Sequence, residues 1–279
     1  MLVTLRDIFA PCAKKACAVG AFNVHNLEFI KGVIGGAEAE NKPAIMMINE
    51  AVLKYGEIEV FGMACLAAAR RASVPIAVMV DHGEDIEFLK KALDAGIDIM
   101  YDGSHLPFAE NVANTKALAE YAHAKGLSIE GEIGALGLSE DGDKEGEVRM
   151  TTTDEAVAFS SQTGIDVLAI SVGNVHGFYK GEAKIDVDRI LAISKAVNHM
   201  PVVMHGGSDI PYTTIKASIQ NGIQKFNIAT DLKQAYAVAM RELVGGEHME
   251  IQPLKLFPVA AKKVSNVVSQ KIKMFNLEV

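Results

Sequence analysis

Eight short apolar segments recur at regular intervals along the 279-residue chain, and a longer segment with helical spacing follows nearly every one. Most are continuously apolar, as parallel strands covered on both faces should be. They lie at residues 18–24, 43–49, 75–81, 96–103, 127–134, 166–173, 201–207 and 223–229. Eight strands alternating with helices match the number that closes a (β/α)8 barrel, whereas a doubly wound sheet usually has about five or six strands. We therefore predict an α/β protein with a single TIM-barrel domain spanning residues 1–279.

The segments between the strands carry apolar residues at helical spacing, and several open with Asp, Thr or Pro. The predicted helices lie at residues 57–72, 85–95, 110–125, 154–163, 186–197 and 211–221. Residues 134–150 form a connection that is too long and too rich in glycine and acids to be a simple turn, so we predict a mobile active-site loop. Residues 235–279 are predicted to form a helical tail with a poorly specified end.

Charge and composition exclude several classes of partner. The formal net charge is −8 and no run of lysine or arginine stands out, so the chain lacks a nucleic-acid footprint. No segment approaches the roughly 20 apolar residues of a membrane span, and the N-terminus lacks the apolar stretch of a signal peptide. We therefore expect a cytoplasmic protein with no membrane partner, in which Cys12, Cys17 and Cys65 are ordinary buried or free thiols.

Polar side chains end almost every predicted strand, on the rim where barrels of this kind carry their chemistry. His82, His176 and His205 follow strands three, six and seven, and three imidazoles with a vacant position are a known catalytic zinc arrangement. A histidine hydrogen-bonded within a polar rim is the alternative for any one of them. Asp81 is a candidate general acid and base beside the metal. Asp102 and Glu132 are candidates to orient the histidines or to hold a second metal.

A separate anion site is expected after strands seven and eight, where barrels commonly bind phosphate through backbone N–H groups. Gly206–Ser208 and Asn227–Thr230 lie at these two positions. Lys180 would add a point charge. Glu140, on the predicted loop, is a second carboxylate that loop closure would deliver, although a solvated acid is the alternative.

The segments AFNVHNLE, DHGED, DGSHLPFAENV, EGEIGALGLSEDG, GNVHGFYKGE, HGGSDIP and KFNIATDLK, taken in this order, resemble the class II fructose-bisphosphate and tagatose-bisphosphate aldolase family. The resemblance runs from Gly20 to about residue 235. It implies that His82, His176 and His205 bind a catalytic zinc ion and that Asp102 and Glu132 lie near a second or vacated metal site. Sodium or potassium near the phosphate and a homodimer or homotetramer are further traits that the resemblance implies.

The resemblance also implies roles in catalysis and substrate binding. Asp81 corresponds to the residue that exchanges a proton with the C4 hydroxyl of the ketose, and Glu140 to the loop acid that acts at C1 of the enediolate left by cleavage. The residues implied to bind dihydroxyacetone phosphate are Asn23, Gly177, Lys180, Gly206, Gly207, Ser208, Asn227, Ile228, Ala229 and Thr230.

The expected function is zinc-dependent, reversible cleavage of a ketose 1,6-bisphosphate, with fructose 1,6-bisphosphate favoured, to dihydroxyacetone phosphate and glyceraldehyde 3-phosphate. This is a carbon–carbon lyase of sugar-phosphate metabolism such as glycolysis. Alternative substrates are tagatose 1,6-bisphosphate and 6-phospho-5-dehydro-2-deoxygluconate. An inactive sugar-phosphate-binding protein is a more remote alternative. A metal-dependent hydrolase on the same barrel would need a His-x-His pair on strand one, where Asn23-Val24-His25 supplies only one histidine. A Schiff-base mechanism would need a strand-end lysine, which strand six lacks.

Three positions depart from the family pattern. Leu138 stands where glycine is usual before the loop acid, Asp209 stands where glycine is usual after the phosphate-binding serine, and Asn49-Glu50 replaces a serine before glutamate. Leu138 would stiffen the loop, and Asp209 would place an acid beside the phosphate or pair with Lys180. Activity or substrate choice is therefore expected to differ from that of a typical member.

Overall fold

The strands form a closed barrel. The structure is a computed structural model that describes residues 1–135, 148–177, 179, 183–198, 200–245 and 249–279. Eight parallel strands pair in chain order and the last pairs with the first. They are β1 Val19–Asn23, β2 Ala44–Asn49, β3 Ile76–Gly83, β4 Asp98–Tyr101, β5 Ile129–Ile133, β6 Val167–Ile170, β7 Val202–Met204 and β8 Ile223–Ile228. The predicted barrel and all eight strand segments are confirmed, with β3 extending two residues beyond its predicted end.

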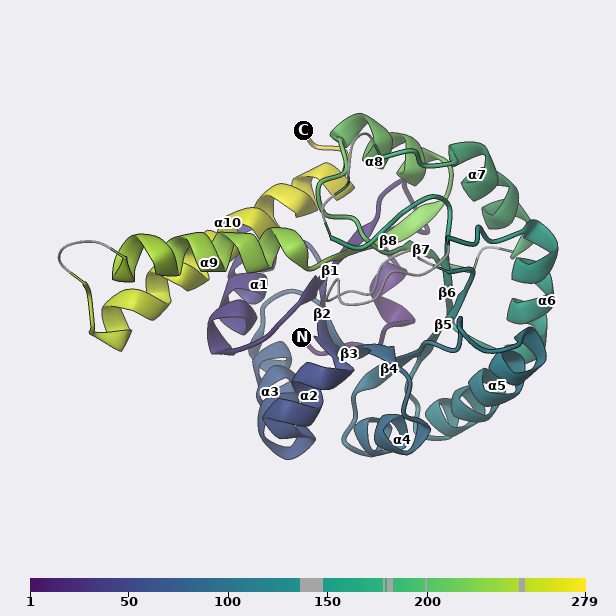
Figure 1. Cartoon of the computed structure of the whole chain (residues 1–279), viewed down its shortest axis with the longest axis horizontal. Helices are drawn as coiled ribbons and strands as arrows, with labels where there is room; N and C mark the ends of the chain where they lie inside the picture. The colour runs from purple at the N-terminus through teal and green to yellow at the C-terminus, as the bar shows by residue number, and fades with distance from the viewer. Residues whose placement is uncertain (136–147, 178, 180–182, 199, 246–248) are drawn as a thin grey trace.

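Helices surround the strands (Figure 1). They are α1 Leu27–Glu40, α2 Glu50–Gly56, α3 Met63–Arg71, α4 Ile86–Asp94, α5 Phe108–Ala124, α6 Thr153–Thr163, α7 Val187–Ala196, α8 Tyr212–Gln220, α9 Thr230–Val244 and α10 Pro253–Phe275. The predicted helix at 57–72 is only partly right, because its first turn is the π-helical stretch η2 Glu57–Gly62. Among the described residues, no helix combines the length and the apolarity needed to cross a bilayer.

The barrel interior is apolar at one end and polar at the other. Side chains two residues apart on a strand share a face, so Ala77, Met79 and Asp81 of β3 all lie on one side of the sheet. Ala77 and Met79 belong to a buried cluster with Leu5, Ile8 and Phe9, which come from the N-terminal segment and its short 3-10 helix η1 Asp7–Phe9. This segment therefore packs against the apolar end, and the polar residues lie toward the carboxyl ends of the strands.

The C-terminal tail is better defined than predicted. Helix α10 lies along α1 (Figure 1), and its residues Val264 and Val268 are fully buried. The two helices approach closely because a Cβ atom on Gly32 or Gly36 of α1 would lie within 2.5–2.6 Å of these valines. The expectation of a poorly specified end was wrong, because residues 253–275 form one helix that covers α1.

Candidate active site

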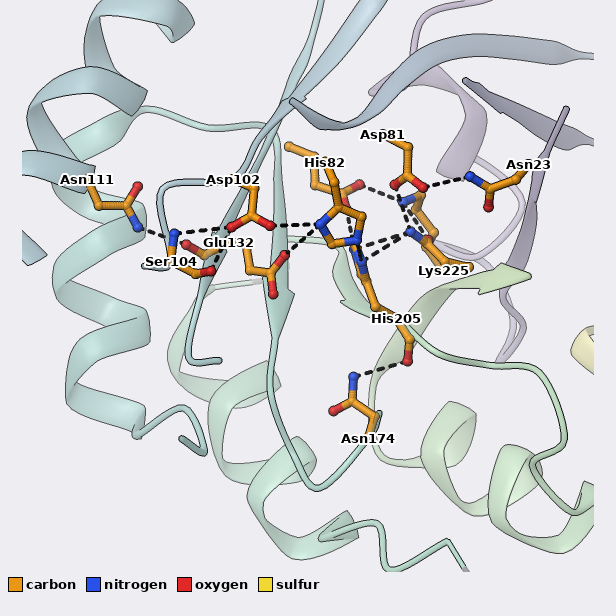
Figure 2. A network of polar contacts seen from close by, with 12 residues as sticks. Asn23, Asp81, His82, Asp102, Ser104, Asn111, Glu132, Asn174, His205 and Lys225 are labelled. Atoms are coloured by element: carbon orange, nitrogen blue, oxygen red, sulfur yellow. Dashed lines mark hydrogen bonds and ion pairs between the residues drawn. The ribbon is translucent and has the colours of Figure 1, made fainter. Parts of the chain in front are cut away.

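His82 occupies a strained position between two groups of polar side chains. Its φ is 47°, in the left-handed region that residues other than glycine rarely adopt. Such backbone strain is often retained at functional sites. Its Nδ1 lies 2.8 Å from Asp102 Oδ2, and its Nε2 lies 2.8 Å from His205 Nδ1 (Figure 2). The unusual backbone thus aims both ring nitrogens at partners.

The three predicted metal histidines come together. One ring nitrogen each of His82, His176 and His205 lie within 4.8 Å of one another. The centroid of the His176 ring lies 4.9 Å from that of His82 and 6.0 Å from that of His205. His205 is held by its other nitrogen, Nε2, which lies 2.9 Å from Glu130 Oε1, and Asn174 donates a 3.0 Å hydrogen bond to its backbone carbonyl.

The nitrogens of His82 and His205 that face each other suit a bound cation. If both rings are neutral, His82 Nδ1 donates to Asp102 and His205 Nε2 donates to Glu130, so two lone pairs face each other across 2.8 Å. That arrangement requires a proton or a metal ion between them. A carboxylate that fixes the tautomer of a histidine in this way is typical of metal sites.

The pKa values of the two histidines move in opposite directions. Burial disfavours protonated His82, but the carboxylates of Asp81, Asp102 and Glu132 outweigh burial and raise its pKa well above the ordinary value. Burial lowers the pKa of His205 well below the ordinary value, and the nearby charges of His82 and Lys225 lower it further. Of the two rings, His82 therefore has the higher affinity for a proton.

A second group of possible ligands overlaps the first. His82, Asp102 and Glu132 each offer one atom within 4.8 Å of the others. Asp102 is fixed by Ser104, whose hydroxyl donates to it at 2.6 Å. Burial, followed by the charge of Asp102, raises the pKa of Glu132 well above its ordinary value. Its buried Oε2 has no hydrogen-bond partner and lies 3.7 Å from His82 Nδ1. A cation or a proton would compensate this carboxylate.

Asp81 is buried beside the histidines and oriented by two amides. Asn23 Nδ2 donates to Asp81 Oδ2 at 2.8 Å, and Asn227 Nδ2 donates to Oδ1 at 3.2 Å. Asn23 and Asn227 come from β1 and β8, so three strands fix this carboxylate. Such an orientation is what a general base requires before it can act on a hydroxyl.

The predicted anion site borders the histidines. A small cavity of about 20 Å³ joins the two regions and is lined by Asp81, His82, His176, Gly177, Gly206, Ser208, Asn227, Ala229 and Thr230. Gly206 has a φ of 63°, and a Cβ atom there would lie 1.9 Å from the carbonyl oxygen of Val175, so only glycine fits. The buried Ser208 accepts a 3.3 Å hydrogen bond from the backbone N–H of Asp231.

Several predicted site residues lie elsewhere. The Ile228 side chain is fully buried in the apolar core, so any contact with a ligand would involve its backbone. Gly207 is near Asn227, to whose carbonyl it donates at 2.9 Å, but it does not line the cavity. Glu140, Leu138 and Lys180 lie outside the described residues. The described base of the predicted loop is pinned by an antiparallel bridge between Ala135 and Arg149.

Comparison with known proteins decides the family. Residues 3–278 match the family described as fructose-bisphosphate aldolase class-II. The chain belongs to this family. It is therefore an aldolase, a carbon–carbon lyase.

Its relatives carry different names. The aldolase is 35% identical to a fructose-bisphosphate aldolase of Staphylococcus aureus (strain Mu50), over 98% of this chain and 97% of the relative. It is also 35% identical to a 6-phospho-5-dehydro-2-deoxy-D-gluconate aldolase of Shouchella clausii, over 98% and 94%. Among solved structures, the YdjI aldolase of Escherichia coli K12 superimposes with a TM-score of 0.87 at 32% identity, covering 99% of this chain and 97% of the other. Equal identity to two differently named aldolases leaves the substrate to be decided by the site.

Two charged residues inside the barrel of the aldolase were not predicted to be functional. Lys225 Nζ lies 2.8 Å from Glu130 Oε2 and 2.8 Å from Asn227 Oδ1, and both charged side chains are completely buried. Glu130 contacts His205, and Lys225 contacts Asn227, which in turn donates to Asp81. The ion pair therefore connects His205 with Asp81. A lysine in the middle of an apolar strand was the available signal. Lys225 lies inside the barrel in the ion pair with Glu130 and does not line the cavity.

Proposed function

We propose that this aldolase catalyses the zinc-dependent, reversible cleavage of a ketose 1,6-bisphosphate, fructose 1,6-bisphosphate above others, to dihydroxyacetone phosphate and glyceraldehyde 3-phosphate. The observation that carries the proposal is the placement of Asp81. Its carboxylate is buried, held by two amides, and shares a cavity with His82 and His176. A base is thus fixed beside a group of imidazoles that suits a metal ion.

His82, His176 and His205 would hold the zinc ion, with His82 using Nε2 and His205 using Nδ1. Their other contacts, to Asp102 and Glu130, would keep these nitrogens unprotonated and correctly oriented. When bound, zinc supplies Lewis-acid stabilisation of the negative charge left on the three-carbon product. Asp102 and Glu132 would orient His82 or, in an alternative state in which His82 Nδ1 has given up its proton, would hold a second metal with that nitrogen.

The protein residues would bind the substrate and move the protons. Asp81 accepts the proton of the C4 hydroxyl as the C3–C4 bond breaks, and C4 leaves as the aldehyde carbon. Glu140 would return a proton to C3 of the ketose, which keeps the electron pair of the broken bond and is C1 of the three-carbon enediolate. Backbone N–H groups of Gly206, Ser208 and Asn227–Thr230, with Gly177, Asn23 and Lys180, would hold dihydroxyacetone phosphate, and a sodium or potassium ion would lie beside the phosphate.

The similarity to a 6-phospho-5-dehydro-2-deoxy-D-gluconate aldolase supports a second candidate substrate. Tagatose 1,6-bisphosphate, which differs from the fructose compound in configuration at C4, is a third. The hydroxyl presented to Asp81 would be the one on C4 in the two bisphosphates and the one on C3 in 6-phospho-5-dehydro-2-deoxygluconate, which is numbered from its carboxyl end. In each compound this hydroxyl is on the carbon that leaves as the aldehyde, so the same chemistry would serve all three. Parallel measurement of kcat/KM for the three compounds would identify the preferred one.

The decisive experiment measures cleavage of these compounds before and after chelation, with zinc added back and a borohydride trap in parallel. We expect activity to disappear on chelation, to return with zinc, and to leave no trapped adduct. Activity that resists chelation would remove the histidine trio from the mechanism. An adduct trapped at Lys225 would indicate a Schiff base instead.

We further propose a homodimer or homotetramer. Helices α9 and α10 extend away from the barrel (Figure 1). The far part of this arm exposes apolar side chains, namely Met249, Ile251, Leu254, Phe257 and Val259. Exposed apolar patches often mark contacts between subunits. Sedimentation analysis of the wild-type protein and L254E tests whether the arm is the contact, since a charge there should shift the protein toward monomer.

A further inference from the structure

Two of the three cysteines touch each other at the end of the barrel opposite the candidate active site. Cys12 follows η1 and Cys17 precedes β1, and their Sγ atoms are 2.8 Å apart. This separation is within about 0.8 Å of the length of a disulfide bond. Both residues are buried, yet neither is completely inaccessible, with 8% and 5% of their surfaces exposed. The third cysteine, Cys65, is completely buried on α3 and takes no part in this contact.

A cavity of about 220 Å³ gives access to this pair. Its lining includes Cys12, Cys17, Lys15 and Lys42. The two lysines face Glu278, with Nζ to carboxylate distances of 3.9 Å and 2.7 Å. A small disulfide reagent that enters the cavity would therefore meet both sulfur atoms in one place, beside two lysines that are paired with Glu278.

We propose that Cys12 and Cys17 form a reversible disulfide by exchange with a small-molecule disulfide that enters this cavity, and that the bond ties the N-terminal segment to β1. The residues between the two cysteines, 13–16, are exposed, so the sulfur atoms can move together without disturbing packed side chains. The site is separate from the residues proposed for aldol cleavage, so its test does not depend on which sugar phosphate is the substrate.

Cys17 is the residue that would attack first. The hydrogen bond from the Cys12 thiol lowers the pKa of Cys17, and Lys15 and Lys42 lower it further against the effects of burial and of Glu278. The same hydrogen bond and burial raise the pKa of Cys12, so it keeps its proton at first. The Cys17 thiolate would attack the reagent disulfide RSSR, forming a mixed disulfide and releasing RS⁻.

In the second step Cys12 gives up its proton, and its thiolate attacks Cys17 Sγ. The bond between Cys17 and the RS group breaks, and a second RS⁻ leaves. The net reaction converts two protein thiols and RSSR into one protein disulfide and two RSH, so two electrons pass from the protein to the reagent. A small disulfide such as oxidised glutathione is the only co-reactant needed.

The bond should stabilise the folded protein, because it closes a short loop and restricts the unfolded chain. Residues Leu5, Ile8 and Phe9 close the apolar end of the barrel, and the disulfide would fasten the segment that follows them. For a six-residue loop in a protein of this size we expect a rise in melting temperature of roughly 5 °C.

The experiment treats the full-length protein with oxidised glutathione and counts free thiols, with intact mass and peptide mapping. We expect the count to fall from three to one, with a mass loss of about 2 Da and a cross-linked peptide joining residues 12 and 17. Reduction should restore all three thiols. Retention of three thiols at equilibrium with oxidised glutathione, or a cross-link that includes Cys65, would overturn the proposal.

Single substitutions provide matched controls. C65S should behave as the wild-type protein does, whereas C12S should stop at a glutathione adduct on Cys17 and show no rise in melting temperature. C17S should remain largely unmodified because Cys12 is the poorer nucleophile. An equal rise in melting temperature for C12S and the wild-type protein would contradict the stabilising role of the bond.

Discussion

Asp81 is the residue on which the proposed chemistry depends most directly. Replacing it with alanine removes the base beside the C4 hydroxyl but none of the histidines, so we expect kcat to fall roughly 100-fold or more with zinc still bound. Turnover and zinc content measured on the same preparation test this. D81N keeps the size of the side chain and should show the same loss, which separates the missing base from a cavity. Wild-type turnover in D81A would remove Asp81 from the mechanism.

Asp209 combines a strained backbone with an unfavourable charge. Its φ is 60°, in the left-handed region that favours glycine, and its side chain is exposed next to the buried Ser208. The charge of Asp209 acts on a side chain beside the predicted phosphate site. Burial, and then the charge of Asp209, raise the pKa of Tyr179 to about 12. The Tyr179 hydroxyl donates a 3.3 Å hydrogen bond to the Gly206 carbonyl. For D209G we expect a gain in unfolding free energy of about 0.5–1 kcal/mol and a lower KM for the phosphorylated substrate.

D209N separates these two effects, because asparagine tolerates the same backbone region but carries no charge. KM should fall in D209N as it does in D209G, and stability should change little. A KM that is unchanged in both variants would mean that Asp209 does not act on the phosphate.

At this scale the sequence predicts residues that end strands better than residues inside them. His82, His176 and His205 could be found because each follows an apolar run, and the barrel then brings them together. Glu130 and Lys225 were missed as a pair because they are 95 positions apart and lie on strands that do not pair, so that only closure of the barrel brings them together in its interior. The other departure, Asn49-Glu50, has a local structural role, since Asn49 caps α2 and Glu50 accepts from the backbone N–H of Glu84.

Strand β8 carries Lys225 and Asn227 on its inward face, and the buried ion pair with Glu130 joins it to β5. K225M keeps the length of the side chain but leaves the Glu130 carboxylate buried without its cation. We expect the unfolding free energy to fall by about 3–5 kcal/mol, as measured in urea. K216M, an exposed change of the same kind on α8, should alter it by less than about 0.5 kcal/mol.

The double variant E130Q/K225M tests the cause of this loss. Removing both charges should recover part of the stability, although His205 would still have a weaker partner. If the double variant were less stable than K225M by the full cost of E130Q alone, the two residues would not be coupled.

Element boundaries were predictable where caps are local. Asp85, Thr152 and Asp186 each accept a backbone N–H at the start of a helix, and α4, α6 and α7 begin within one residue of their predicted starts. Asn26 caps α1 in the same way, although no helix was predicted there. The tail was not predictable in this way. Its helix α10 is positioned by Gly32 and Gly36, more than 200 residues earlier in the chain, and no local pattern in the tail reveals that contact.

At the scale of the whole molecule, the barrel is closed at its apolar end by long-range contacts of the N-terminal segment. Asp98, at the start of β4, accepts backbone hydrogen bonds from Leu5 at 2.6 Å and Ser128 at 2.7 Å. Burial raises the pKa of Asp98 to about 7 despite these two bonds. One carboxyl group thus links the stability of this closure to pH.

The sign of this link follows from proton uptake. Between about pH 4 and pH 7 the folded protein holds a proton on Asp98 that the unfolded chain has lost, so its contribution to stability falls as pH rises, by at most about 4 kcal/mol. D98N cannot titrate, and it loses one of the two backbone bonds. We therefore expect D98N to be clearly less stable than the wild-type protein near pH 4 and the difference to shrink toward pH 7. Urea unfolding across this range measures both curves. Parallel curves would mean that Asp98 is already ionised in the folded barrel at pH 4, and that the two backbone bonds outweigh its burial.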